Sequence, residues 1–200
     1  MDDLLNGYRR FRTEVWPAER ARYESLSRRG QAPKTLVVAC SDSRVDPATV
    51  FAAAPGELFV ARNVAGLVPP YQPDGEYHGT SAVLEYGVRV LKVARIVVLG
   101  HAQCGGVQAL VQGAPAEARD FVEPWMGMIK NLARPAPHSG CDALTHFETE
   151  VVRLSLENLL TFPWIRSAVE AGDLSLHGMR FDIHVGELSR LEGDRFVVIE

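Results

Sequence analysis

The sequence predicts an α/β fold in which a central, mainly parallel β-sheet is flanked by helices. Residues 35–40 and 95–100 form two short runs that are almost wholly apolar, and such runs are typical of strands buried on both faces of a parallel sheet. A third strand is expected over residues 57–61, and a helix over residues 79–93. Because strands here alternate with helices, parallel pairing through right-handed crossovers is expected.

The first 30 residues are expected to form an N-terminal helical arm, and residues 31–200 the α/β core of the same single domain. Leu4, Tyr8, Phe11 and Val15 recur at helical spacing and give one apolar stripe. Pro17 is expected to divide the arm into two helices, and Gly30 is a suitable C-terminal stop. The arm could lie on its own domain or across a second subunit.

The segment 79–93 has apolar residues on two faces, so we expect it to be sandwiched between the sheet and a partner chain. These residues are Val83, Tyr86, Gly87, Val90 and Leu91 on one face, and Leu84 and Val88 on the other. Residues 117–133 and 145–161 are expected to be helical, with a breaker-rich stretch at 134–140 between them. Two late strands are expected near 174–184 and 194–199, the last as a C-terminal edge strand.

Composition and charge exclude some classes of partner. The chain has 200 residues, is 46% hydrophobic and carries a formal net charge of -4, with no long basic run, which argues against nucleic acid as a partner. The cluster Arg9, Arg10 and Arg12 is read as a solvated helix face. No apolar stretch approaches the roughly 20 residues that span a bilayer, and the N-terminus lacks a signal-peptide pattern, so no membrane partner and a cytoplasmic location are expected.

Metal-capable side chains follow both apolar runs. Cys40 ends the first run, and the second leads into His101 and Cys104. Ligands bind beyond the carboxyl ends of parallel strands, and two thiolates with one imidazole suit Zn²⁺. Three protein ligands are the pattern of catalytic zinc, which keeps one position open for water, and the hydroxide form should gain population towards alkaline pH. Alone, Cys40 would more often be a core thiol and His101 a loop histidine; their combination with Cys104 favours the metal.

Asp42 and Arg44 follow Cys40 closely. Alternation along an extended segment would put residues 40, 42 and 44 on one side. Asp42 could accept a hydrogen bond from a zinc-bound hydroxide, or could itself ligate zinc and block the site. A bidentate pair with Arg44 would hold the carboxylate off the metal and keep it ionised.

Several turn and helix-start signals surround these motifs. Asp46 and Pro47 are a good N-cap and first-turn pair. Gly105 and Gly106 stand at the expected start of a helix, where their backbone N–H groups could approach an anion such as bicarbonate. With three cysteines in all, a complete disulfide framework is impossible. Cys141 is read as incidental, and the remaining histidines as structural or exposed: His78, His138, His146, His177 and His184.

In these residues the chain resembles the β-class carbonic anhydrases. The family pattern C-x-D-x-R followed some 60 residues later by H-x-x-C is found as C-S-D-S-R at 40–44 and H-A-Q-C at 101–104. Segments 55–57, 62–65, 80–86 and 158–163 also look like family segments, so the resemblance covers about residues 31–184. It implies one zinc ion per chain and a carbonic anhydrase, a lyase, in which zinc-bound hydroxide attacks CO₂ to give bicarbonate and a proton. Asp42 would orient the hydroxide and Arg44 would restrain Asp42.

The resemblance also implies a homodimer or a dimer-based oligomer, with the N-terminal helices reaching onto the neighbouring subunit. The plant-like subtype places a Gln, a Phe and a Tyr around the substrate, and Gln31, Phe59 and Tyr86 stand at the matching positions. Another subtype has an inhibitory bicarbonate site built from a Trp, an Arg and a Tyr. Here those positions hold Val37, Arg62 and Phe181, so no cooperative inhibition by bicarbonate is expected.

Two other functions stay open at this point. A similar zinc site on this fold could hydrolyse a related heterocumulene, carbon disulfide or carbonyl sulfide, and the shape of the access channel would decide. The chain could also be a non-catalytic zinc-binding protein. The presence of Asp42 and Arg44 argues against the latter, because structural zinc needs neither residue.

Overall fold

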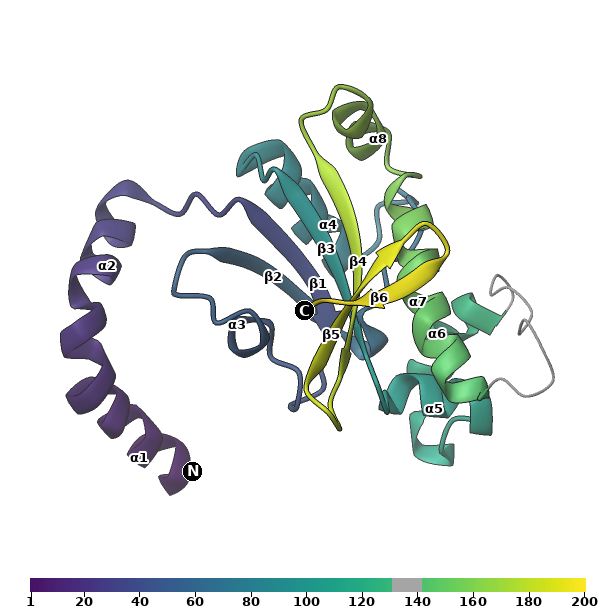
Figure 1. Cartoon of the computed structure of the whole chain (residues 1–200), viewed down its shortest axis with the longest axis horizontal. Helices are drawn as coiled ribbons and strands as arrows, with labels where there is room; N and C mark the ends of the chain where they lie inside the picture. The colour runs from purple at the N-terminus through teal and green to yellow at the C-terminus, as the bar shows by residue number, and fades with distance from the viewer. Residues whose placement is uncertain (131–141) are drawn as a thin grey trace.

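The computed structural model describes residues 1–130 and 142–200. Within these residues a twisted six-stranded sheet has the order β2-β1-β3-β4-β5-β6 (Figure 1). The first four strands of this order pair in parallel, and the last three pair antiparallel, which confirms the expected mainly parallel sheet. The strands are β1 (Thr35–Cys40), β2 (Leu58–Asn63), β3 (Arg95–His101), β4 (Ser175–Asp182), β5 (Glu187–Glu192) and β6 (Arg195–Val198).

The two apolar runs form neighbouring central strands, β1 and β3, whose residues are buried almost throughout. Successive side chains of a strand point to opposite faces. One set therefore joins the core on one face (Leu36, Val38, Ile96, Val98) and the other set joins the core on the opposite face (Val37, Ala39, Val97, Leu99). Both faces need apolar cover, which is why the alternation of a half-buried strand is missing here.

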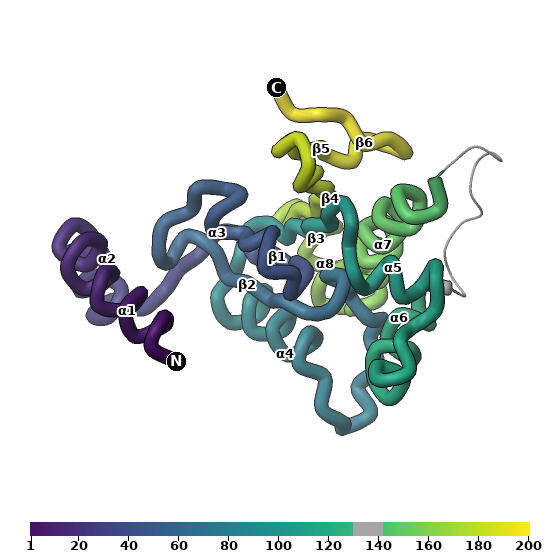
Figure 2. The backbone as a smooth tube through the Cα atoms, turned by 90° about the horizontal axis from the view of Figure 1, so that it is seen from below, coloured from purple at the N-terminus to yellow at the C-terminus, as the bar shows by residue number. Residues whose placement is uncertain are grey.

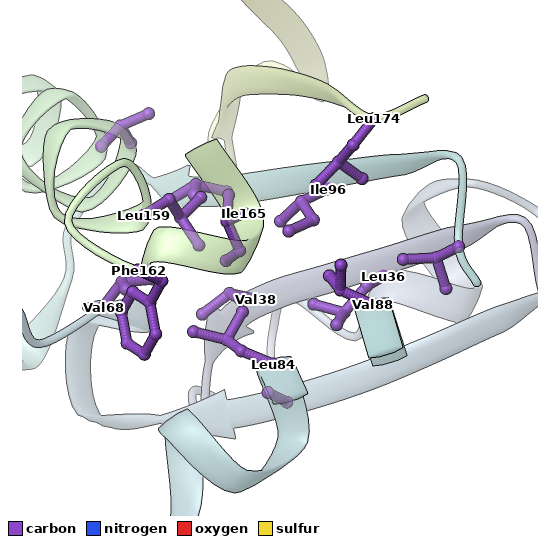
Figure 3. Packing of buried hydrophobic residues seen from close by; sticks show 14 residues of the cluster. Leu36, Val38, Val68, Leu84, Val88, Ile96, Leu159, Phe162, Ile165 and Leu174 are labelled. Atoms are coloured by element: carbon purple, nitrogen blue, oxygen red, sulfur yellow. The ribbon is translucent and has the colours of Figure 1, made fainter. Parts of the chain in front are cut away.

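Three helices cover the first of these faces: α4 (Gly79–Glu85), α7 (Ala143–Leu159) and α8 (Pro163–Glu170). Figure 3 shows Leu84 of α4 and Leu159 of α7 converging with Phe162 and Ile165 on the strand residue Val38. These side chains are almost completely buried, and each stabilises the fold by roughly 1.5–3 kcal/mol relative to an exposed position.

The opposite face is covered more lightly. Phe51, which follows the short helix α3 (Pro47–Val50), packs there with Met179 of β4 and Leu188 of β5. Beyond the carboxyl ends of β1 and β3 lie the segments η2 (Val64–Gly66), α5 (Gly105–Gln112), η4 (Ala116–Ala118) and α6 (Val122–Lys130). The end of the sheet that carries Cys40 and Cys104 is therefore enclosed by η2, α5, α6 and α7.

The N-terminal arm stands away from the sheet (Figures 1 and 2). It consists of α1 (Asp2–Arg10), a π-helical turn η1 (Phe11–Val15) and α2 (Trp16–Arg29), and no side chain of this fully described arm is buried. The expected break at Pro17 is wrong: a π-helical turn precedes α2, Pro17 lies in the first turn of α2, and the chain stays helical throughout. Gly30 ends α2 at a φ of 78°, as expected.

Other expectations need correction. β5 was not expected, because Glu187–Glu192 is a largely polar, half-exposed strand without an apolar run. The segment 79–93 is α-helical only to Glu85 and continues as the π-helical turn η3 (Tyr86–Val90). The helices expected over 117–133 and 145–161 are α6 and α7 with shifted bounds. The breaker-rich stretch 134–140, His138 and Cys141 lie outside the described residues.

Candidate metal centre

Parallel pairing brings three ligand residues together. β1 and β3 are neighbours in register, so Cys40 and His101 end their strands at the same edge of the sheet, and Cys104 follows three residues after His101. Their ligand atoms all lie within 4.8 Å of one another, and the two sulfur atoms are 4.0 Å apart. All three residues are buried. Among the described residues, these three side chains form a group of ligands that could hold a metal ion.

The hydrogen bonding of His101 suits this residue to bind a metal ion. Its Nδ1 donates a hydrogen bond to the backbone carbonyl of Ala102 at 2.8 Å, which leaves a lone pair on Nε2. Nε2 is buried and has no hydrogen-bond partner among the described residues. An unsatisfied buried polar atom costs about 1–3 kcal/mol, so a metal ion at this position would relieve a real penalty. The orphaned nitrogen and two nearby thiols fit Zn²⁺.

The two thiols share a hydrogen bond, with their sulfur atoms 4.0 Å apart. This bond lowers the pKa of Cys40, and His101 and the N–H of Asp42 act in the same direction. The pKa of Cys104 is raised by its hydrogen bond to Cys40 and by burial. Burial lowers the pKa of His101, but the neighbouring Cys40 outweighs it and the net shift is upward. A second thiolate 4.0 Å from the first therefore needs a cation between them, as a divalent metal would provide.

Asp42 and Arg44 form a bidentate ion pair beside the ligands. Arg44 Nε and Nη2 donate to the two carboxylate oxygens of Asp42 at 2.9 and 2.8 Å, and Nη2 also donates to the carbonyl of Gln103 at 3.0 Å. The guanidinium holds the pKa of Asp42 well below its usual range. Asp42 is thus an ionised acceptor, tied through Arg44 to the loop that carries Cys104.

A turn brings this pair together, and the expected alternation is wrong. Residues 40, 42 and 44 do not follow one extended segment, because β1 ends at Cys40 and the chain turns at Ser43 and Arg44. The backbone N–H of Arg44 donates to the Asp42 carboxylate at 2.9 Å, and the N–H of Val45 donates to the carbonyl of Asp42 at 3.2 Å. Asp42 is therefore the polar anchor of the turn as well as the partner of Arg44.

Arg62 has a role that sequence reasoning did not find. From β2 its guanidinium donates to the carbonyl of Cys40 at 2.9 Å, to the carbonyl of Asp42 at 2.6 Å and to the carboxylate of Asp46 at 3.0 Å. Asp46 caps α3, as expected, by accepting from the N–H of Thr49. Arg62 therefore fixes both ends of the Cys40–Asp46 turn. The signal in the sequence was a charged residue near the end of a strand that is otherwise apolar up to that point.

Gly105 and Gly106 begin α5 directly after Cys104, which is its N-cap. A Cβ on Gly106 would lie 2.8 Å from Val64 Cγ1, so this glycine allows α5 to pack closely on η2. Gly105 faces open space. The N–H groups of Gly106 and Val107 favour the thiolate of Cys104. Binding of bicarbonate by the glycine N–H groups stays a prediction.

The three substrate residues expected from the resemblance are not beside the ligands of their own chain. Phe59 and Tyr86 contact each other, with ring centroids 5.8 Å apart. Phe59 pairs in register with Leu36, four residues before Cys40, a distance of about 13 Å along the strand. Gln31 is exposed and precedes the opposite end of β1. Their role towards substrate stays a prediction that requires a second subunit.

The three positions considered for an inhibitory bicarbonate site are not arranged as a binding pocket. Val37 is fully buried in the core, and Phe181 packs with it. Arg62 is occupied by the three contacts described above. The expectation of non-cooperative inhibition stays a prediction.

Comparison with known proteins agrees with this site. A family model described as carbonic anhydrase matches residues 35–188, and the chain belongs to this family. Curated relatives include a carbonic anhydrase of Pseudomonas aeruginosa, 39% identical over 96% of this chain and 88% of that protein. Another is the chloroplastic β carbonic anhydrase 5 of Arabidopsis thaliana, 38% identical over 88% of this chain and 60% of that protein.

Solved structures place the chain in the β class of carbonic anhydrases, which are lyases. The β-carbonic anhydrase CcaA is 32% identical and superimposes with a TM-score of 0.87 over 100% of this chain and 92% of that chain. The Coccomyxa β-carbonic anhydrase, in complex with acetazolamide, is 31% identical with a TM-score of 0.78 over 94% of this chain and 85% of that chain. None of the described helices is both long and apolar enough to cross a membrane.

Proposed function

We propose that this chain catalyses the reversible hydration of CO₂ to bicarbonate and a proton, with one zinc ion per chain. The observation that carries the proposal is the orphaned Nε2 of His101 facing two buried thiols, next to the ion pair of Asp42 and Arg44. A structural zinc site would need a fourth protein ligand and would have no use for that ion pair. Cys40, His101 and Cys104 would hold the ion.

Zinc bound by these residues supplies acidification of water, so that a hydroxide nucleophile is available near neutral pH. Asp42 would orient the O–H group of this nucleophile. Because its carboxylate is ionised and can only accept, it fixes the direction of an O–H group placed next to it and so aims the oxygen lone pairs at CO₂. Arg44 occupies both carboxylate oxygens, and these bonds must break before Asp42 can turn onto the metal.

A homodimer, or an oligomer built from dimers, is part of this proposal. β2 is an edge strand, and its Val60 is exposed together with Tyr86 and Val90 of η3. The apolar stripe of the arm is also exposed, at Leu4, Tyr8 and Val15. Apolar surface of this extent fits a second copy of the chain. In that arrangement Gln31, Phe59 and Tyr86 would line a site at the subunit interface. A similar solved structure, 28% identical to this chain, comes from work on two tetrameric β-carbonic anhydrases of Sordaria macrospora.

We also propose a cytoplasmic location. Cys40 and Cys104 are free thiols with sulfur atoms 4.0 Å apart, close enough to be at risk of oxidation to a disulfide. A reducing compartment keeps both thiols available as ligands.

The test is stopped-flow CO₂ hydration on the purified protein, with zinc per chain measured on the same sample. The proposal predicts about one zinc per chain and hydration that is lost when zinc is removed and restored when it is returned. Carbon disulfide and carbonyl sulfide are assayed in parallel, because faster turnover of either would reassign the substrate. A zinc-loaded protein with no turnover of any of the three compounds would contradict an enzymatic function.

A further inference from the structure

A buried ion pair lies directly behind the metal ligands. Glu148 of α7 has a side chain only 1% exposed, and its Oε2 accepts hydrogen bonds from Arg180 of β4, at 2.8 Å from Nη2 and 3.3 Å from Nε. Its other oxygen, Oε1, accepts from the backbone N–H of Cys104 at 3.4 Å. A buried carboxylate is costly unless it is paired and hydrogen-bonded, so both contacts are needed to keep it there.

Two glycines allow α7 to come close enough for this contact. A Cβ on Gly100 would lie 2.6 Å from Val152 Cγ2, and one on Gly178 would lie 2.8 Å from Val152 Cγ1. Val152 therefore sits in a groove over β3 and β4, and Glu148 lies one helical turn earlier on the same face of α7. Gly100 also immediately precedes His101. The same close packing thus places Glu148 at the loop that follows β3 and carries Cys104.

We propose that Glu148 is a positioning residue for the metal centre: its carboxylate holds the backbone of Cys104 so that the thiolate faces Cys40 and His101. Arg180 anchors the carboxylate from β4, where it is in register with Gly100. On its other side the loop is held through the carbonyl of Gln103, which accepts from Arg44. This inference rests on the proposed zinc site. It predicts a loss of zinc affinity of about 10- to 100-fold when the contact is removed, as is typical for partners of metal ligands.

The experiment compares two double variants that both remove the buried charges. Glu148→Gln with Arg180→Met keeps a side-chain oxygen that can accept from Cys104, whereas Glu148→Met with Arg180→Met does not. Zinc affinity is measured by competition with a chromophoric chelator, and the Co²⁺-substituted proteins are compared by their absorption spectra. The first variant should bind zinc within a few-fold of the wild type, and the second about 10- to 100-fold more weakly, with an altered Co²⁺ spectrum.

A matched control lies on the same helix. Glu150 is also buried and pairs with Arg153 at 3.2 Å, with side chains 8% and 13% exposed. Arg153 in turn donates to the carbonyl of Asp194 at 2.6 Å, so this pair ties α7 to the turn between β5 and β6, away from the Cys104 loop. Glu150→Met with Arg153→Met should lower stability without lowering zinc affinity. Equal zinc affinity for the two Glu148 variants, or an equal loss in the control, would overturn the inference.

Should the variants fail to fold, the wild-type protein crystallised with zinc provides the test. A distance of about 3.5 Å or less between Glu148 Oε1 and Cys104 N supports the inference, and a longer one overturns it. Wild-type protein that binds no zinc would instead refute the proposed function itself, so the two failures are distinguishable.

Discussion

Gly66 offers a direct test of how the fold holds Cys40 in place. Gly66 has a φ of 64°, in the left-handed region, and a Cβ there would lie 3.0 Å from both the carbonyl carbon of Ala39 and the backbone nitrogen of Cys40. These atoms belong to β1, which is paired on both sides by β2 and β3 and cannot shift freely. Gly66→Ala should therefore be strongly destabilising and should displace a proposed zinc ligand.

The size of the effect separates into two parts. A left-handed conformation costs a non-glycine residue about 1–2 kcal/mol, and forcing a methyl group against packed backbone costs about 1–3 kcal/mol more. Gly172 is the control, because its φ is 79° and a Cβ there meets open space. Gly172→Ala should cost only the first part, about 1–2 kcal/mol, and Gly66→Ala about 2–5 kcal/mol in total.

The assay is urea unfolding at fixed protein and zinc concentrations, since a bound metal adds its own stabilisation. Zinc affinity is measured on the same samples and should fall only in Gly66→Ala. Free energies of unfolding that agree within about 0.5 kcal/mol for the two variants would refute the reasoning, because the packing contribution would then be absent.

Three further predictions concern the site and the assembly. Asp42→Asn should retain zinc but lose about 100-fold or more of its CO₂ hydration rate, since orientation is lost; near-normal turnover would contradict this. Arg44→Met removes the cation that lowers the pKa of Asp42, so that pKa rises and the acid limb of the pH–rate profile should move to higher pH; an unmoved limb would count against the pair. Val90→Asp should weaken self-association at least about 10-fold in sedimentation velocity, whereas Val185→Asp, equally exposed at 59%, should not; equal effects would place the interface elsewhere.

The parts of the fold that could be predicted are those with a strong local signal. β1 and β3 are central strands, so burial on both faces demands continuous apolar runs. The spacing of Cys40, His101 and Cys104 at the ends of these runs was enough to place the ligands together, because parallel neighbours end at the same edge.

The missed features depend on contacts far apart in sequence. β5 is stabilised by pairing with β4 and β6 and has no apolar pattern of its own. Arg62 reaches the Cys40 turn across a strand pair, and Glu148 reaches Cys104 across 44 residues. In each case a polar side chain satisfies backbone groups that only the folded chain brings near it, and neither periodicity nor spacing reports such a contact.

The arm and η3 show two further differences between the sequence expectations and the structure. Pro17 was expected to break the arm, but it lies in the first turn of α2, where a proline is tolerated, and the chain stays helical through the π-helical turn before it. Of the two apolar faces expected for residues 79–93, the one with Leu84 and Val88 is buried in the core, and the one with Tyr86 and Val90 is exposed at both of these residues in the single chain. The pattern was therefore real, but its partner surface can be tested only in the assembled protein.

The most direct measurement of the central claim is zinc K-edge X-ray absorption on the purified, metal-loaded protein. The account predicts one zinc per chain with two sulfur neighbours at about 2.3 Å, one histidine nitrogen at about 2.0–2.1 Å and one further light-atom ligand from solvent. A shell of four protein ligands, or zinc that remains bound after Cys40 and Cys104 are both replaced by Ser, would contradict it.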